Sequence, residues 1–154
     1  MEILEKYGII RLAGNSKEIE VNGQKLNICG VDDPKYDLYE NDYHISNALY
    51  DIQKGLQGDS FTLLLSHRPE YFSFYADYGF DLTLCGHAHG GQWRIPGLLN
   101  KGLIAPNQGL FPKYTNGIHT QGDSSMIVSR GLAKESTLVP RFYNRPEIVI
   151  IELQ

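Results

Sequence analysis

The chain has little of what would indicate a nucleic-acid partner, a membrane span or a disulfide framework. Its 154 residues carry 14 Lys and Arg against 18 Asp and Glu, and no basic run occurs, which argues against duplex nucleic acid or an anionic membrane surface. No apolar run approaches the roughly 18 residues of a membrane helix. Two cysteines are too few for a disulfide framework, so Cys29 and Cys85 are expected to be small core residues.

Internal repeats, low-complexity tracts and linkers are also lacking. A hydrophobic content of 42% suits one globular domain with a moderate core, so residues 1–154 are predicted to form a single domain. The amino terminus does not show the basic and then apolar pattern of a signal peptide. The chain as given is therefore expected to be soluble.

Hydrophobic periodicity predicts an α/β chain in which strands and helices alternate. Apolar residues at helical spacing predict helices within residues 2–12, 42–56 and 69–78. Asn22-Gly23 joins two alternating runs and predicts a β-hairpin of residues 18–21 and 26–31. Further strands are expected at residues 60–66, 80–84, 118–121, 125–129 and 148–153.

Three histidines follow two of these strands. His67 comes directly after the apolar run 61–66, and His87 and His89 come just after the run that ends at Leu84. The order strand, helix, strand predicts a parallel pair, whose functional residues gather at the carboxyl ends of the strands. Neutral imidazoles suit Zn, Mn or Fe, so His67, His87 and His89 are predicted metal ligands.

Other residues near these histidines leave alternatives open. Arg68 either contacts a substrate phosphate or serves the structure by capping a helix or pairing with Glu70. His44 and His119 are expected to be surface or half-buried polar residues. The Gly- and Pro-rich stretch 90–116 is unusually long for a loop and is suspected to form a wall of the site.

Four segments together resemble the second half of a bacterial calcineurin-like metallophosphoesterase: LLSHRPE at 64–70, GHAHGGQ at 86–92, SRGL at 129–132 and RFYNRPE at 141–147. The resemblance implies half of a four-layer α/β/β/α sandwich, with a mixed β-sheet and helices on one face. It also implies a phosphoester hydrolase centre of two divalent ions, bridged by an aspartate and a hydroxide. His67 and His87 would bind one ion, and His89 would bind the other.

The motifs of the family's first half have no usable counterpart here. The family supplies an Asp-x-His pair, a Gly-Asp-x-x-Asp segment with the bridging carboxylate, and a Gly-Asn-His segment with the catalytic histidine. Asp42-Tyr43-His44 matches the first by letters alone, because residues two apart on a helix project about 200° from one another. The catalytic residues are therefore unknown, and the chain is expected to be truncated, to hold at most one weakly bound ion and to be inactive alone.

Other functions compatible with these residues are kept as alternatives. One is a non-catalytic metal-binding fragment, or a subunit completed by a separate amino-terminal chain. Another is a mononuclear zinc hydrolase with three histidine ligands and an open water position. The phosphoester substrate is left open among monoesters, diesters, nucleotides and lipid pyrophosphate head groups. Localisation, cytoplasmic or peripheral to a membrane, would depend on an absent amino-terminal segment.

The predicted strands are apolar on both sides, and this indicates a partner. Helices around residues 42–56 and 70–78 can cover one side of the sheet, whereas nothing in the sequence is expected to cover the other. Exposed apolar faces of that size usually drive association. The chain is therefore predicted to form a homo-oligomer, most simply a dimer, through the uncovered sheet face unless a missing amino-terminal half covers it.

Overall fold

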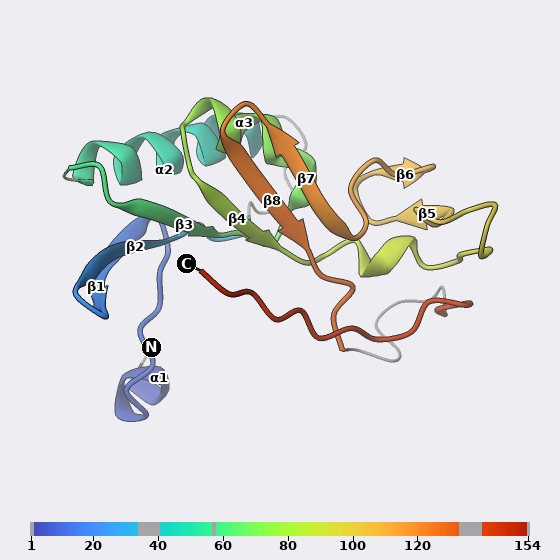
Figure 1. Cartoon of the computed structure of the whole chain (residues 1–154), viewed down its shortest axis with the longest axis horizontal. Helices are drawn as coiled ribbons and strands as arrows, with labels where there is room; N and C mark the ends of the chain where they lie inside the picture. The colour runs from blue at the N-terminus through green and yellow to red at the C-terminus, as the bar shows by residue number, and fades with distance from the viewer. Residues whose placement is uncertain (1, 34–40, 57, 133–139, 154) are drawn as a thin grey trace.

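The fold centres on a six-stranded mixed sheet with two helices packed on one face (Figure 1). The computed structural model describes residues 2–33, 41–56, 58–132 and 140–153. The strands of the sheet follow the order β1-β2-β3-β4-β8-β7, and β5 and β6 form a separate two-stranded sheet. The strands are β1 Asn15–Val21, β2 Gln24–Gly30, β3 Phe61–Leu65, β4 Leu82–Cys85, β5 Ile104–Ala105, β6 Gly109–Leu110, β7 Gly117–Gln121 and β8 Ser124–Val128. The helices are α1 Glu2–Lys6, α2 Asn41–Gly55, η1 Pro69–Tyr71, α3 Phe72–Asp77 and η2 His89–Gly91.

The predicted hairpin at Asn22-Gly23 is confirmed as the β1–β2 pair. Both turn residues have positive φ, 54° at Asn22 and 80° at Gly23, as a two-residue turn between twisted strands requires. The antiparallel register runs from Val21 opposite Gln24 to Asn15 opposite Gly30. The strands predicted at residues 118–121 and 125–129 are present as β7 and β8, which form a second hairpin that turns between Gln121 and Ser124.

The centre of the sheet is parallel. β2 pairs with β3, β3 with β4 and β4 with β8, all in parallel, whereas β1 and β7 are antiparallel edge strands. Between β3 and β4 the chain passes through η1 and α3, as the predicted order of strand, helix and strand requires. This topology brings the carboxyl ends of β3 and β4 to the same edge of the sheet.

The covered face of the sheet holds the hydrophobic core. From α2, the side chains at the predicted helical spacing of three to four residues are buried at Ile45, Leu49 and Ile52. From α3, the aromatic side chains of Phe72 and Tyr75 are buried beside them. The strands contribute Cys29, Leu64, Cys85, Met126 and Val128. Both cysteines are buried and unbridged, as predicted.

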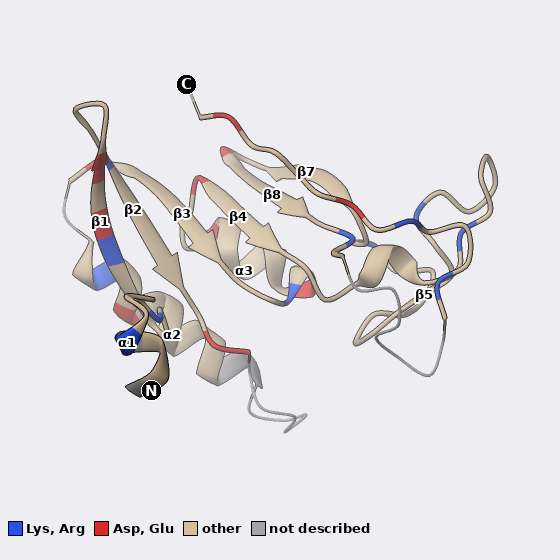
Figure 2. Ribbon diagram, turned by 90° about the horizontal axis from the view of Figure 1, so that it is seen from below, with Lys and Arg blue, Asp and Glu red and all other residues tan. Residues whose placement is uncertain are grey.

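The other face of the sheet, the open face, carries apolar residues that the helices do not reach. Seen from below, β3, β4 and β8 carry no Lys, Arg, Asp or Glu on this face (Figure 2). The segment of residues 147–151 passes over it, and between this segment and the sheet lies a cavity of about 310 Å³. The open face is therefore covered only in part.

The prediction of a strand at residues 148–153 is wrong. This segment is extended but joins no ladder, and Ile150 is 91% exposed. Its neighbour Glu147 donates one backbone hydrogen bond to Gly131. A strand needs a neighbour beside it, and this segment lies over a face of the sheet instead of along an edge.

The first predicted helix is short, and it ends where a glycine permits. α1 spans Glu2–Lys6, within the predicted range 2–12, and Gly8 follows with a φ of +69°. None of the described helices has the length and apolar character needed to cross a lipid bilayer. The helix predicted at residues 42–56 is confirmed as α2, so Asp42-Tyr43-His44 lies in its first turn.

Candidate metal centre

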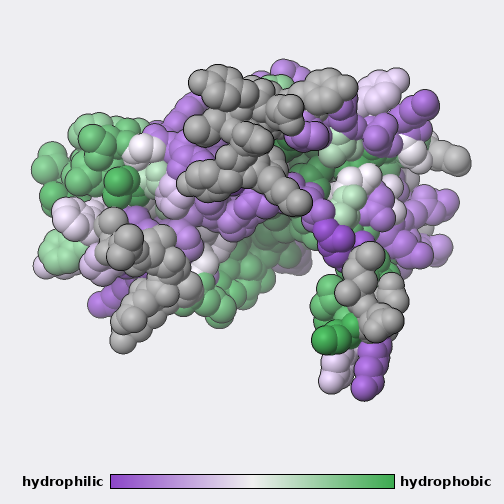
Figure 3. Space-filling model, turned by 180° about the vertical axis from the view of Figure 1, so that it is seen from behind, coloured by the Kyte–Doolittle hydropathy of each residue, from purple (hydrophilic) through white to green (hydrophobic). Residues whose placement is uncertain are grey.

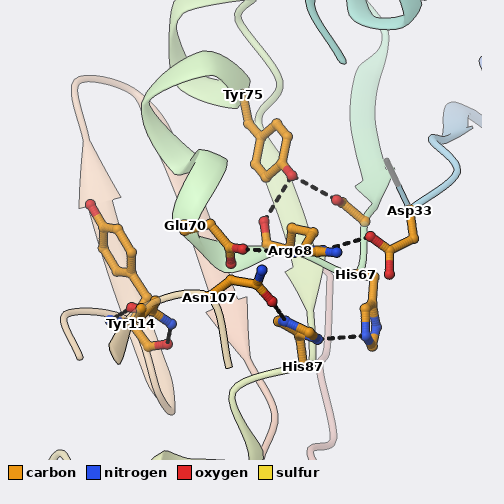
Figure 4. A network of polar contacts seen from close by, with 10 residues as sticks. Asp33, His67, Arg68, Glu70, Tyr75, His87, Asn107 and Tyr114 are labelled. Atoms are coloured by element: carbon orange, nitrogen blue, oxygen red, sulfur yellow. Dashed lines mark hydrogen bonds and ion pairs between the residues drawn. The ribbon is translucent and has the colours of Figure 1, made fainter. Parts of the chain in front are cut away.

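Two of the three predicted ligands meet at the carboxyl edge of the sheet. His67 follows the last residue of β3 by two positions, and His87 follows the last residue of β4 by two positions. The parallel register of β3 and β4 pairs Leu65 with Leu84, so the two loops leave the sheet side by side. Nε2 of His67 lies 2.9 Å from Nδ1 of His87, and the rings meet edge to face (Figure 4).

The polar contacts of His87 favour one tautomer of its ring. Nε2 of His87 lies 2.7 Å from Oδ1 of Asn107, an atom that can only accept, so this contact favours the tautomer with the proton on Nε2. Nδ1 of His87 then has a free lone pair, and in the metal-free state Nε2 of His67 donates to it. The unprotonated nitrogen of His87 therefore points at His67.

This pair of nitrogens fits two ligands of one transition-metal ion. Two imidazole nitrogens bound about 2.05 Å from a tetrahedral zinc ion lie about 3.4 Å apart. The observed separation of Nε2 and Nδ1 is 2.9 Å, so a small rotation of the two rings would direct both lone pairs to one ion. Neutral imidazole is a donor that Zn, Mn and Fe accept and that Ca does not prefer.

The loop that carries His87 and His89 has a backbone conformation that residues other than glycine rarely adopt. His87 has a φ of 65° and His89 a φ of 47°, and Gly90 and Gly91 follow with positive φ. Non-glycine residues in this region are uncommon, and such backbone conformations cluster at functional sites. Tight turns hold the loop, with the Ala88 amide donating to Gly86 O and the Gly91 amide donating to Ala88 O.

A buried amide clamps the same loop from the carboxyl-terminal side. Nδ2 of Asn144 donates to the carbonyl of His89 at 2.5 Å and to the carbonyl of Gln92 at 3.2 Å. A Cβ at Gly90 would collide with Oδ1 of Asn144 and lie 2.8 Å from Cγ of Arg130, so only glycine fits there. Sequence reasoning did not single out Asn144, although it lies in the RFYNRPE segment.

His89 follows His87 by two positions on the same loop, and both His67 and His87 act on it electrostatically. Burial, and after it the charge of Arg141 and the presence of His87 and His67, lowers the pKa of His89 below its ordinary value. Within residues 2–33, 41–56, 58–132 and 140–153, no three His, Cys, Asp or Glu side chains are placed to hold one ion together. The structure thus brings His67 and His87 together, and a ligand role for His89 stays a prediction.

The environment of His67 favours its neutral form. Burial first, and the adjacent His87 second, lower the pKa of His67, against an opposing effect of the Asp33 carboxylate. Only the neutral imidazole ligates a metal ion. A lowered pKa therefore keeps His67 available as a ligand at neutral pH.

Arg68 is buried and held by two carboxylates (Figure 4). Its Nε donates to Oδ1 of Asp33 at 2.5 Å, and its Nη1 lies 3.4 Å from Oε1 of Glu70. The structure therefore contains the ion pair with Glu70 that was one of the two alternatives for Arg68. The ion pair with Asp33 was not predicted. The carbonyl of Arg68 also accepts a hydrogen bond from the Tyr75 hydroxyl at 2.8 Å. Substrate binding by Arg68 stays a prediction.

The remaining two histidines have the surface and half-buried positions that were expected. His44 is exposed on α2 and lines a cavity of about 530 Å³ together with Asp32 and Asp33. His119 is half-buried, and its Nε2 donates to the carbonyl of Asn116 at 3.2 Å. Both predictions of surface or half-buried polar roles are confirmed.

Imidazole nitrogens are common ligands of zinc, and ligands of open α/β sheets bind outside the carboxyl ends of the strands. Two Bacillus subtilis proteins named as uncharacterized metallophosphoesterases are similar to the chain: YkuE, 31% identical over 86% of the chain and 42% of YkuE, and YkoQ, 26% identical over 98% of the chain and 52% of YkoQ. The Escherichia coli phosphodiesterase YaeI is 35% identical over 59% of the chain and 32% of YaeI. The chain belongs to the calcineurin-like metallophosphoesterase family.

The chain spans about half the length of YkuE and YkoQ, the curated relatives that it matches over most of its own length. No protein-family model matches the chain, and no solved structure matches it significantly. Metallophosphoesterases use divalent metal ions in general. The resemblance found in the sequence segments is thereby confirmed at the level of the family.

Proposed function

We propose that this chain holds one divalent transition-metal ion through His67 and His87 and contributes it to the hydrolysis of a phosphoester. The observation that carries the proposal is the 2.9 Å approach of Nε2 of His67 and Nδ1 of His87 at the ends of two parallel strands. Family membership supports the phosphoester as substrate, since the relatives are named as metallophosphoesterases and a phosphodiesterase.

A bound ion would supply Lewis acidity to a phosphoryl oxygen and would lower the pKa of a coordinated water. The chain's own residues would orient the ligands for this chemistry. β3 and β4 hold the two loops in parallel register, and Asn144 fixes the backbone of the second loop through the His89 carbonyl. Arg68 and Asp33 form an ion pair beside His67, which holds the loop after β3 against the segment that follows β2.

We also propose that the chain has no useful hydrolytic activity alone. A two-ion centre needs a bridging carboxylate, and in the described part of the chain no three acidic, histidine or cysteine side chains converge on one point. For the same reason, no observation favours the alternative of a mononuclear zinc hydrolase with three histidine ligands. The proposal thus includes a phosphoester as the substrate and one bound ion, which is Mn, Fe or Zn.

The test of the hydrolytic proposal uses a chromogenic phosphodiester with added manganese. We expect turnover by the wild-type chain to equal that of His87→Ala, because one weakly held ion supplies only part of the transition-state stabilisation. His44→Ala serves as a matched control, since His44 is an exposed histidine outside the pair. Robust turnover that His87→Ala abolishes and His44→Ala preserves would show that the chain hydrolyses phosphodiesters alone.

Inorganic phosphate tests the substrate class separately. An ion with open coordination positions binds phosphate, so we expect calorimetric heat when phosphate is titrated into the manganese-loaded chain and none with His67→Ala/His87→Ala. Equal phosphate binding by both proteins would remove the histidine pair from any role in phosphoester recognition.

A further inference from the structure

The long loop between η2 and β7 delivers one side chain to the histidine pair. Asn107 lies in the turn between β5 and β6, and its Oδ1 accepts a hydrogen bond from Nε2 of His87 at 2.7 Å (Figure 4). The two residues are 20 positions apart in the sequence, so chain proximity does not explain the contact.

The turn that carries Asn107 is anchored to the core through the next residue. Nε2 of Gln108 donates to the Tyr114 carbonyl at 2.7 Å, and Oε1 of Gln108 accepts from the Tyr114 amide at 2.8 Å. The Tyr114 ring is buried and meets Phe72 of α3 edge to face, with ring centroids 5.9 Å apart. The position of Asn107 is therefore held by the same core that supports α3.

We propose that Asn107 is a positioning residue that holds His87 in the tautomer protonated at Nε2, so that Nδ1 is the ligand atom. This inference rests on the proposed function, in which His87 binds the ion. Outer partners of metal-bound histidines commonly fix the tautomer and ring orientation in this way, and their loss typically costs about 10- to 100-fold in metal affinity. The stretch 90–116, which the sequence suggested as a wall of the site, thus acts on His87 through the side-chain amide of Asn107.

The backbone at Asn107 allows a clean test. Its φ is 59°, a conformation that glycine adopts without strain, so Asn107→Gly removes the acceptor and keeps the turn. Asn107→Asp keeps an oxygen acceptor at the same place. Asn22→Gly is a matched control, because Asn22 has a φ of 54° in the β1–β2 turn, far from His87 in the chain and outside its hydrogen bonds.

The first readout is the tautomer of His87 in the metal-free protein, from long-range ¹H–¹⁵N NMR at about pH 8.5, above the ordinary imidazole pKa of ~6.5. We expect protonation at Nε2 in the wild type, in Asn107→Asp and in Asn22→Gly. In Asn107→Gly we expect a mixture in which Nδ1 is partly protonated. A merely structural role of Asn107 would leave this signature unchanged.

The second readout is the zinc affinity of the same four proteins by calorimetry. Asn107→Gly should lose about 10- to 100-fold, whereas Asn107→Asp and Asn22→Gly should bind like the wild type. If Asn107→Gly keeps both the wild-type tautomer and the wild-type affinity, the inference is overturned. A wild type without zinc binding would contradict the proposed function, and the NMR result would still decide whether Asn107 sets the tautomer.

Discussion

Leu64 and Leu65 are neighbours on β3, yet they lie on opposite faces of the sheet in very different surroundings. Leu64 is fully buried in the core beneath the helices, whereas Leu65 on the open face is 40% exposed. The two faces carry similar apolar side chains, and the difference lies in what covers them. Packing on the covered face holds β3 and β4 in place and so positions His67 and His87. The open face leaves apolar side chains exposed to solvent.

The largest expected effect follows from this comparison. Leu64→Ala should lower the free energy of unfolding by about 2–5 kcal/mol, because it leaves a cavity in a closely packed core. Leu65→Ala should cost no more than about 1 kcal/mol, because solvent already reaches the side chain. Equilibrium denaturation in urea measures both variants. Similar losses in the two would mean that the open face is packed in solution.

We predict that a second copy of the chain covers the open face in solution. Hydrophobic side chains gather along the lower edge of the molecule, below the sheet, and at the end that holds β5 and β6 (Figure 3). Burial of apolar surface contributes about 25 cal/mol per Å², so pairing of two open faces would favour a dimer. We expect sedimentation at micromolar concentration to show dimers or larger species.

A matched pair of substitutions tests whether this association uses the open face. Leu65→Lys should shift the equilibrium toward the monomer, because it places a charge in the apolar face. Tyr50→Lys should not, although Tyr50 is 56% exposed, because it lies on α2. A compact wild-type monomer that binds no hydrophobic dye would contradict the predicted association.

Features fixed by short segments could be predicted from the sequence. The Asn22-Gly23 turn, the apolar spacing of α2 and the runs of β3 and β4 each contain their own signal. The placement of His67 and His87 followed from them, because parallel strands end at the same edge of a sheet. The apolar run at residues 148–153 was misleading, because an apolar run does not by itself supply the hydrogen-bonding neighbour that a strand needs.

Contacts across long stretches of chain could not be predicted. The Arg68 guanidinium pairs with Asp33, 35 positions away, and Asn144 reaches the His89 carbonyl from 55 positions away. Asn107 gave no signal of its own, because asparagine is common in turns for backbone reasons alone. Such contacts depend on how loops fold against one another, and periodicity does not encode this.

The central claim is that His67 and His87 form the part of a metal site that this chain supplies, and zinc calorimetry tests it most directly. We expect the wild type and His44→Ala to bind one zinc ion and His87→Ala to lose it. Affinity should fall as pH drops below ~6.5, where protonation competes with the metal for imidazole. Because burial lowers the pKa of His67, His67 should keep its neutral, ligating form to a lower pH than an ordinary histidine. Zinc binding that is indistinguishable between the wild type and His87→Ala would contradict the account.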